Sequence, residues 1–386
     1  MAPRLTFVLP LKGRYLFTLR TLWHGNKLRV PHRFLFADGQ VKNEVARYLE
    51  NSSTYFPALD IEYIRYPNDS SLSKYLTKVA DILSRVRTPY AMLLDNDDFV
   101  GLDAAQWAVD FLDSHPDFVC ARGWLTAFAV HSRGGSRYGG LYGKVSRIHS
   151  QYFREDRSSP AVADRIRQSE LDLGIYNAVY RTETLATIAR EAAEIDFSDL
   201  MLHEVFYALR TATLGKIRVN PAVIGYYRQL GSSITYLSDR DWAGELLRSR
   251  FTVDAHALVE RISSAAAAAD GTDRAAIVEV VRTMLEDNFR WFLWTNYGFS
   301  VGLKRYVRKT WPALASLAQN RPRLVARRGY SALLSRLAAA GASASDVVRA
   351  RAEFAAIEDT LSRKSFDEYA APFLSVAHAD SSRNWF

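Results

Sequence analysis

Three carboxylates within four residues, in the run Asp95-Asn96-Asp97-Asp98, are the part of this sequence best suited to chemistry. They directly follow the apolar run 90–94, where a buried strand is expected to end. Carboxylates this close repel one another unless a cation or hydrogen bonds compensate. Hard divalent cations prefer oxygen ligands, and Mg²⁺ typically takes one or two carboxylates together with substrate phosphates. The cluster therefore predicts a metal–phosphate site; the alternative is that the acids only cap a helix beginning near Asp103.

The elements that would position this cluster alternate between strand and helix patterns, which is typical of an α/β sheet. The strongest helix pattern spans 72–86, where apolar residues fall on one face. In an open sheet of this class, ligands bind outside the carboxyl ends of the strands, where the cluster would lie. The expected strands are 5–9, 34–37, 61–66, 90–94, 118–121, 175–180 and a pair within 216–227, and the other expected helices are 16–22, 41–49, 104–112 and 200–213.

Two parts of the chain break this alternation. Residues 131–170 are rich in Gly, Ser, Arg and Tyr, so we expect a long loop there, either an acceptor loop or lid or a disordered insertion. From residue 238 onward strand patterns disappear, and Ala, Arg and Leu dominate. The sequence thus predicts two domains, an α/β domain at 1–237 and a helical C-terminal domain at 238–386.

The apolar strand followed by the acidic cluster resembles the D-x-D motif of GT-A fold glycosyltransferases, in the D-x-D-D form common in glycosyltransferase family 2. Other segments resemble the family in the same order, over about residues 4–236, and this order and spacing make the combination specific. They are 8–12 (first strand and turn), 36–39 (second strand and its Asp), 72–90 (the lead-in to the D-x-D strand), His203-Glu204 with Arg210 and 215–217, and 226–229 with Ser232-Ser233. The resemblance implies a Rossmann-like, mostly parallel central sheet with flanking helices. It also implies sugar transfer from a nucleotide-sugar donor to a glycan or lipid-linked acceptor, as in building a bacterial surface polysaccharide.

The resemblance also suggests roles for individual residues. Asp97 would ligate Mn²⁺ or Mg²⁺, with Asp95 and Asp98 as further metal ligands. Glu204 would be the general base that activates the acceptor hydroxyl, with Asp199 as the runner-up, and the family favours inverting transfer. Cationic side chains early in the chain could pair with the diphosphate of the donor. The candidate donor-binding residues are Pro10, Lys12, Arg14, Asp38, Asp69, Lys78, Asp95, Asn96 and Arg228.

Two departures from the family pattern keep other functions open. The family's Glu-Asp pair is His203-Glu204 here, and Gln229 stands where many members carry a histidine near the metal. These departures favour, as one alternative, a catalytically inactive carbohydrate-binding protein that keeps the fold. A second alternative is a sugar nucleotidyltransferase. Such enzymes usually carry a glycine-rich loop after the first strand, whereas residues 10–14 contain a single glycine.

Several other protein classes lack their motifs in this chain. There is no G-x-x-x-x-G-K-[ST], G-x-G-x-x-G, G-x-S-x-G or H-E-x-x-H, which excludes P-loop, dinucleotide-binding, nucleophile-elbow and zincin patterns. An EF-hand is excluded because Phe99 stands at the fifth position of the acidic run and no glycine at the sixth. Cys120 is the single cysteine, so no intrachain disulfide or cysteine zinc site can form, and a reducing compartment fits.

Basic residues concentrate near the C-terminus. The chain carries 50 Lys and Arg against 42 Asp and Glu, and the segment 303–351 holds eleven of the basic residues and one acid. This excess predicts an anionic partner, and aromatic residues interleaved with it between 291 and 311 favour a membrane surface over an anionic glycan or nucleic acid. The alternative is a helical subdomain with an aromatic core. No RNP, KH or helix-turn-helix pattern accompanies the charge, so no nucleic acid is expected.

The sequence also gives expectations for localisation. No run of about 18 apolar residues is present, and the first apolar run is too short for a signal peptide. We therefore expect a cytoplasmic protein, peripheral at the inner face of the plasma membrane through its basic region.

Overall fold

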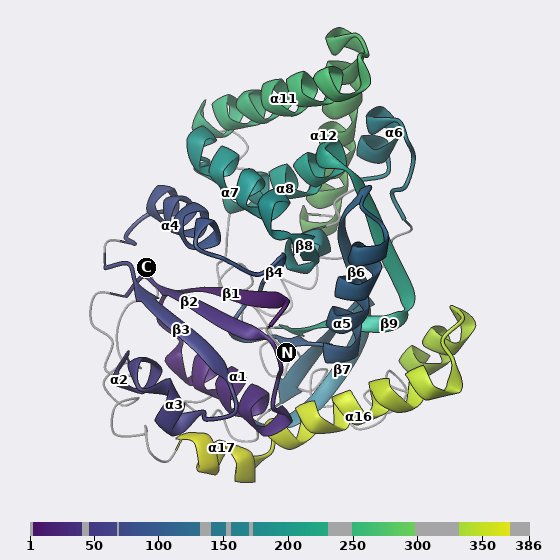
Figure 1. Cartoon of the computed structure of the whole chain (residues 1–386). Helices are drawn as coiled ribbons and strands as arrows, with labels where there is room; N and C mark the ends of the chain where they lie inside the picture. Colours follow the sequence, from purple (N-terminus) through teal and green to yellow (C-terminus); the bar gives the residue numbers. More distant parts are fainter. Residues whose placement is uncertain are drawn as a thin grey trace.

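The computed structural model describes residues 3–40, 46–67, 69–131, 140–151, 156–169, 173–230, 249–297 and 332–370. Within them a nine-stranded sheet has the order β3-β2-β1-β4-β8-β6-β9-β5, with β7 paired to β6, and helices cover both of its faces (Figure 1). The strands are β1 (Leu5–Leu11), β2 (Arg33–Asp38), β3 (Asp60–Arg65), β4 (Tyr90–Leu93), β5 (Phe99–Val100), β6 (Phe118–His131), β7 (Lys144–Gln151), β8 (Val179–Arg181) and β9 (Lys216–Leu230).

Strands β3, β2, β1 and β4 are parallel neighbours, so their carboxyl ends lie at one edge of the sheet. β1 and β4 are apolar and buried almost throughout, as strands covered by helices on both faces must be. β6 and β9 are parallel to each other, while β8, β5 and β7 run antiparallel to their neighbours. The prediction of a mixed, mostly parallel sheet is confirmed.

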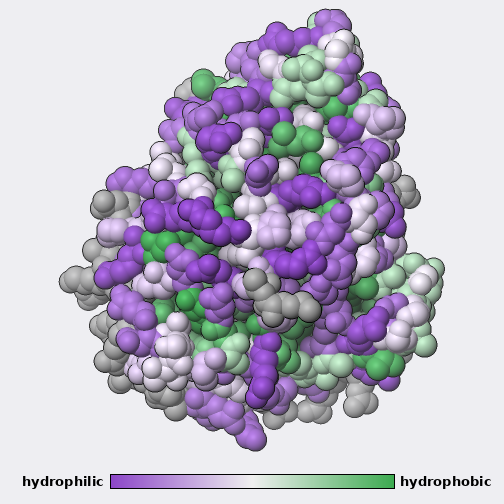
Figure 2. All heavy atoms as spheres, viewed as in Figure 1, coloured by the Kyte–Doolittle hydropathy of each residue, from purple (hydrophilic) through white to green (hydrophobic). Residues whose placement is uncertain are grey.

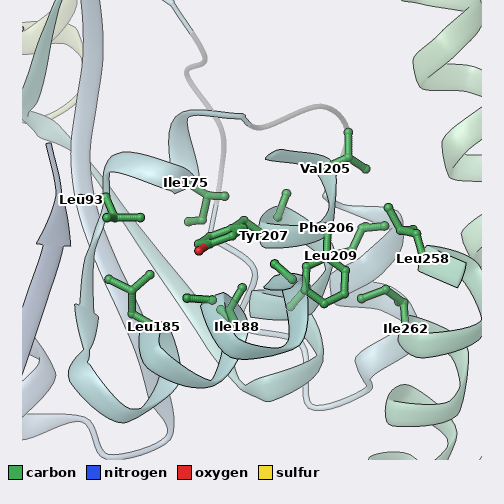
Figure 3. Packing of buried hydrophobic residues seen from close by; sticks show 14 of the residues in the cluster. Leu93, Ile175, Leu185, Ile188, Val205, Phe206, Tyr207, Leu209, Leu258 and Ile262 are labelled. Carbon is green, nitrogen blue, oxygen red and sulfur yellow. The ribbon is translucent and has the colours of Figure 1, made fainter. Parts of the chain in front are cut away.

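Helices pack on the two faces of the sheet in separate apolar cores. One core joins the sheet to α1 (Tyr15–Leu28) and α5 (Leu102–Ser114), a second joins it to α4 (Leu72–Ser84), α7 (Thr182–Ile195) and α8 (Leu200–Leu214), and a third joins it to α16 (Ala344–Thr360). The second core continues into α11: Figure 3 shows Phe206 and Leu209 of α8 beside Leu258 and Ile262. The helices are α1 (Tyr15–Leu28), α2 (Ala46–Glu50), α3 (Ser52–Tyr55), α4 (Leu72–Ser84), α5 (Leu102–Ser114), α6 (Val162–Arg167), the 3₁₀ helix η1 (Leu173–Asn177), α7 (Thr182–Ile195), α8 (Leu200–Leu214), α11 (Ser249–Asp270), α12 (Arg274–Tyr297), one at 332–339, α16 (Ala344–Thr360) and α17 (Arg363–Ala370).

The described part of the chain after residue 248 is helical, as predicted, and it reaches both faces of the sheet. α11 and α12 pack near α6 and α8, whereas α16 and α17 lie against α1 at the opposite side (Figure 1). Polar contacts attach α16 to the first helix and to β9: Lys27 Nζ lies 2.6 Å from Asp359, and the Tyr227 hydroxyl donates to Glu353 over 2.9 Å. The expected domain boundary at residue 237 lies outside the described residues and stays a prediction.

Some local predictions were wrong. Residues 175–180 were expected as a strand, but they form most of η1 and the first part of the short strand β8. The expected strand pair within 216–227 is the single strand β9, and 118–121 is only the beginning of β6. The expected loop at 131–170 contains β7 and α6, with 132–139 and 152–155 outside the described residues. These elements depend on long-range pairing, which short apolar runs do not reveal.

The backbones of β6 and β9 approach closely where their register shifts. A Cβ atom at Gly123 would lie 2.6 Å from the backbone nitrogen of Gly225, so only glycine fits there. The shift lets β9 continue where its sequence suggests a turn.

The face of the molecule seen in Figure 2 is mainly polar. On the face drawn in Figure 2, hydrophilic residues predominate and hydrophobic residues occur in scattered groups. Among the described residues, no helix combines the length and apolar character needed to cross a bilayer.

Candidate active site

The topology brings the predicted site residues to one edge of the sheet. Lys12 and Arg14 follow β1, Asp38 ends β2, Asp69 follows β3, and the acidic run 95–98 follows β4. Because β1 to β4 are parallel neighbours, these positions share the carboxyl-end edge. Ligands of open α/β sheets bind at this edge. The prediction that the acidic cluster ends a buried strand is confirmed.

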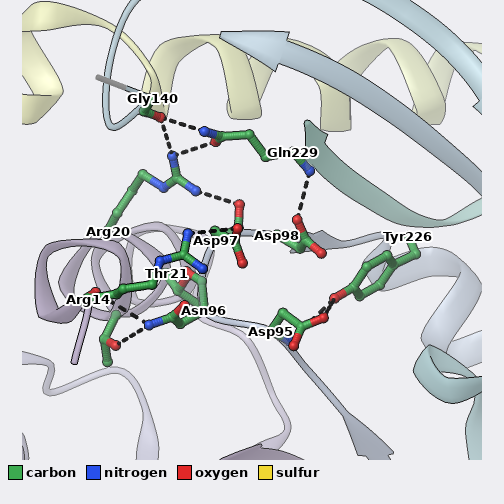
Figure 4. A network of polar contacts seen from close by, with 11 residues as sticks. Arg14, Arg20, Thr21, Asp95, Asn96, Asp97, Asp98, Gly140, Tyr226 and Gln229 are labelled. Carbon is green, nitrogen blue, oxygen red and sulfur yellow. Dashed lines mark hydrogen bonds and ion pairs between the residues drawn. The ribbon is translucent and has the colours of Figure 1, made fainter. Parts of the chain in front are cut away.

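Each carboxylate of the cluster has a different partner (Figure 4). Asp97 Oδ2 lies 2.7 Å from a guanidinium nitrogen of Arg14, and Asp98 Oδ1 accepts from the backbone nitrogen of Gln229 over 2.7 Å. Asp95 Oδ2 lies 3.5 Å from the Tyr226 hydroxyl. None of these carboxylates caps the following helix, because Gly101 is the N-cap of α5 and gives no side-chain cap. The capping alternative is therefore wrong.

The electrostatics of the cluster indicate a shortage of positive charge. Burial, followed by repulsion from Asp97, raises the pKa of Asp95 and raises that of Asp98 well above its usual value. Burial lowers the pKa of the nearby Arg228, but the charges of Asp98, Glu204 and Asp95 outweigh burial and raise it. Arg228 is thus held in its charged form between the acidic cluster and α8.

The donor set fits a hard divalent cation in type and charge. Its members are carboxylates, which Mg²⁺ and Mn²⁺ prefer, and added positive charge would relieve the repulsion that raises their pKa values. Within the described residues no three such side chains are gathered around one point. The cluster therefore suits a cation that takes one or two carboxylates from the protein and its other ligands from phosphate and water. Asp97 and Asp95 are the residues that would hold it.

Arg20 was not predicted from the sequence as a site residue, and it contacts the acidic cluster from helix α1. Its side chain is fully buried in α1, and it donates to the backbone oxygen of Asp97 over 2.6 Å and to Gln229 Oε1 over 2.8 Å. A third bond, over 3.1 Å, reaches the backbone oxygen of Gly140. Burial lowers the pKa of Arg20 to about 10, so it stays charged at neutral pH. Gln229 also donates to the Gly140 oxygen over 2.7 Å. It therefore influences the acidic cluster through its bonds to Arg20 and Asp98.

Asp38 lies at the end of β2, where the resemblance predicts a contact to the nucleoside. Its carboxylate is buried and accepts hydrogen bonds from the hydroxyls of Tyr63, over 2.6 Å, and Tyr15, over 3.3 Å. The backbone nitrogen of Gln40 donates to it over 3.0 Å. These bonds hold the Asp38 carboxylate in place at the carboxyl-end edge of the sheet.

The other predicted donor-binding residues are divided between the surface and the interior. Lys12 is exposed, and Pro10 lies within β1. Lys78 is buried and donates to Asp69 over 2.5 Å and to the Leu11 backbone oxygen over 2.9 Å. The pair Lys78 and Asp69 therefore fixes the end of β1. Asn96 donates to Thr18 Oγ1 over 3.1 Å, which ties the acidic run to α1.

Glu204 is half-buried in the first turns of α8, near enough to Arg228 for its charge to act on that arginine together with the charges of Asp98 and Asp95. Its charge contributes to raising the pKa of Arg228 and, after burial and Asp95, that of Tyr75. Arg210, which could have paired with Glu204, instead binds Glu191 through two bonds of 2.8 Å. Pairing between Glu204 and Arg210 is thereby excluded.

Asp199, the runner-up base, caps α8. Its carboxylate accepts from the backbone nitrogens of Met201, over 2.8 Å, and Leu202, over 3.2 Å. The capping role that its position predicts is confirmed.

His203, next to Glu204, is buried among the rings of Tyr176, Phe197 and Tyr207. Within the described part of the chain neither of its ring nitrogens has a hydrogen-bond partner, and burial lowers its pKa to about 3. The unfolded chain, with a histidine pKa near about 6.5, takes up a proton before the folded chain does. Stability is therefore lost as the pH falls from about 6.5 toward 3.

His203→Phe is expected to flatten this loss, because phenylalanine keeps a ring and takes up no proton. The slope of the unfolding free energy against pH should fall by up to about 1.4 kcal/mol per pH unit between about pH 6 and 4. Urea unfolding at several pH values measures it, with His115→Phe at an exposed position as the matched control. Equal slopes in His203→Phe and wild type would place the proton uptake elsewhere.

Comparison with known proteins supports the fold. No protein-family model and no curated protein sequence matches the chain. Among solved structures, residues 1–349 of S. aureus TarS in complex with UDP-GlcNAc match with a TM-score of 0.50 at 17% identity, covering 90% of this chain and 89% of that one. Mannosyltransferase PcManGT from Pyrobaculum calidifontis, in complex with GDP-Man and Mn²⁺, matches with a TM-score of 0.37 at 13% identity, covering 88% and 86%. The first likeness, together with the sheet order, confirms the GT-A fold.

Proposed function

We propose that this protein is a glycosyltransferase that moves a sugar from a nucleotide-sugar donor to a glycan or lipid-linked acceptor, using a divalent cation. One observation carries the proposal: the carboxylates of 95–98 lie at the carboxyl-end edge of a GT-A sheet. The UDP-GlcNAc in the TarS complex supports a nucleotide-sugar donor for this fold. The classes of donor and acceptor in this proposal are taken from the resemblance in the sequence.

The described residues supply the parts that such a transfer needs. In this proposal Glu204 takes the proton of the acceptor hydroxyl as the hydroxyl oxygen bonds to the anomeric carbon and the bond to the diphosphate breaks. Attack from the face opposite the diphosphate inverts the anomeric carbon. A divalent cation on Asp97 and Asp95 would neutralise the leaving diphosphate as a Lewis acid. Arg228 is half-buried, and its charge would offset those of Asp98, Asp95 and Glu204.

A screen of nucleotides and a test of activity separate this proposal from its alternatives. Thermal shift with UDP, GDP and their sugars, with and without Mn²⁺, identifies the nucleotide. Chromatography then measures release of nucleoside diphosphate from the matching donor. We expect Mn²⁺-dependent release. Release of pyrophosphate from a nucleoside triphosphate would instead indicate a nucleotidyltransferase, and binding without any turnover would indicate a carbohydrate-binding protein.

The basic region is proposed to attach the enzyme to anionic membrane, which would bring it to a lipid-linked acceptor. Residues 303–331 of this region lie outside the described residues, so the sequence alone supports this step. We expect the protein to float with anionic vesicles at low salt, since each basic residue near the surface contributes about 1 kcal/mol. Replacing Lys304, Arg305, Arg308 and Lys309 by Gln should abolish recovery. No flotation of the wild type would contradict the attachment.

A further inference from the structure

We infer that Arg14 competes with the cation for Asp97: it holds this carboxylate while the site has no ligand, and it passes to the diphosphate of the donor once the cation arrives. This inference rests on the proposed function, and it assigns Arg14 a positioning role that couples the two ligands. It predicts that removing Arg14 changes the binding of cation and of nucleotide in opposite directions.

The contact between Arg14 and Asp97 is close and shielded. The guanidinium nitrogen and Oδ2 are 2.7 Å apart, and the two side chains are 9% and 5% exposed. Charged hydrogen bonds of this length are among the strong ones. A divalent cation on the same carboxylate would bring a second positive charge beside the guanidinium, and the repulsion between the two would weaken the hold of each on Asp97.

The backbone of Arg14 is fixed, and its guanidinium contacts Phe17 as well as Asp97. Arg14 has the left-handed conformation with φ 55°, directly after Gly13 with φ 67°, and its backbone oxygen accepts from Asn96 Nδ2 over 3.3 Å. A left-handed arginine is strained, and such strain collects at ligand sites. The guanidinium also lies 4.5 Å from the ring centroid of Phe17, a contact that does not need Asp97. Because the backbone of Arg14 stays at the end of β1, a guanidinium released from Asp97 would remain within the length of one side chain of the site.

Charge balance favours the exchange. Four carboxylates of the site outnumber the three arginines that the described contacts place beside them; they are Asp95, Asp97, Asp98 and Glu204 against Arg14, Arg20 and Arg228. Binding of a cation supplies the missing charge and frees a guanidinium. A planar guanidinium matches a phosphate group through two bonds. The freed Arg14 therefore adds nucleotide affinity only after the cation is in place.

Arg29 provides a matched control at the other end of the same helix. It is also an arginine in the left-handed conformation, with φ 52°, and it is exposed. Arg14→Gly and Arg29→Gly each remove one positive charge and one strained residue of α1. Of the two arginines, the one paired with Asp97 is Arg14.

The experiment measures binding of Mn²⁺ alone by electron paramagnetic resonance, and binding of UDP and GDP with Mn²⁺ present by calorimetry. Arg14→Gly should bind Mn²⁺ at least about fivefold more tightly than wild type, since even exposed ion pairs can reach that strength. It should bind the nucleotide at least about fivefold more weakly. Arg29→Gly should change neither value. Arg14→Gln, which keeps the length of the side chain, should behave as Arg14→Gly does and replaces it if that variant does not fold.

The outcomes separate this inference from the proposed function. If Asp97→Asn abolishes Mn²⁺ binding but both Arg14 variants keep the wild-type Mn²⁺ affinity, competition is overturned and the cation site stands. Weaker Mn²⁺ binding in the Arg14 variants would also overturn it, because Arg14 would then support the site. If Asp97→Asn leaves Mn²⁺ binding unchanged, the cation site itself is wrong.

Discussion

Asp97→Asn is expected to weaken Mn²⁺-dependent binding of UDP or GDP by more than about tenfold, since losing even a residue that supports a metal ligand typically costs 10–100-fold in affinity. Asparagine keeps the shape of the side chain and removes its charge. Asp97 is 4% exposed and lies at the end of β4, so its loss leaves the cation with fewer anionic oxygens. Isothermal calorimetry with and without Mn²⁺ measures the effect.

Two controls show that the loss is specific. Asp110→Asn changes an exposed carboxylate on α5 and should leave nucleotide affinity unchanged. The substitution at Asp97 also leaves Arg14 buried without this partner, which destabilises the fold. Adding Arg14→Gly removes that charge, and the double variant should recover thermal stability but not Mn²⁺-dependent binding. Wild-type affinity in folded Asp97→Asn would remove Asp97 from the cation site.

The part of the fold that could be predicted is the part with local signals. β1 and β4 are continuous apolar runs that end in turn residues, and α4 carries its apolar residues on one face. β8 has only three residues, and β9 runs past a proline and a glycine that suggest a turn. Both are held by partners far away in the sequence, so no local pattern defines them.

The site could be predicted to a similar extent. Three carboxylates in four residues are recognisable in the sequence as a candidate site, and the parallel strands place them at a ligand-binding edge. Arg20 gave no signal, because an arginine in an amphipathic helix is normally solvated. Its buried role depends on Gly140 and Gln229, which lie 120 and 209 positions away. The pairing of Arg14 with Asp97 likewise appears only in three dimensions, although both residues were candidates.

Glu204→Gln is expected to lower the rate of sugar transfer by about 10²–10⁴, the usual cost of losing a general base, with donor binding near normal. Glutamine keeps the size of the side chain and removes its basic oxygen. Two contacts in the structure bear on this role: Arg210 pairs with Glu191, and Asp199 caps the first turn of α8. The assay is transfer at saturating donor, with calorimetry for donor binding.

The matched control is Glu194→Gln, a carboxylate on α7 that is 50% exposed and pairs with Arg261; it should keep wild-type transfer. A base also titrates, so the acid side of the pH–rate profile should disappear in Glu204→Gln, which a purely structural loss would not produce. Transfer within about threefold of wild type, well short of the loss expected for a base, would move the role to Asp199. Asp199→Asn then tests that residue cleanly, because asparagine caps a helix as well as aspartate does and leaves α8 intact while removing the base.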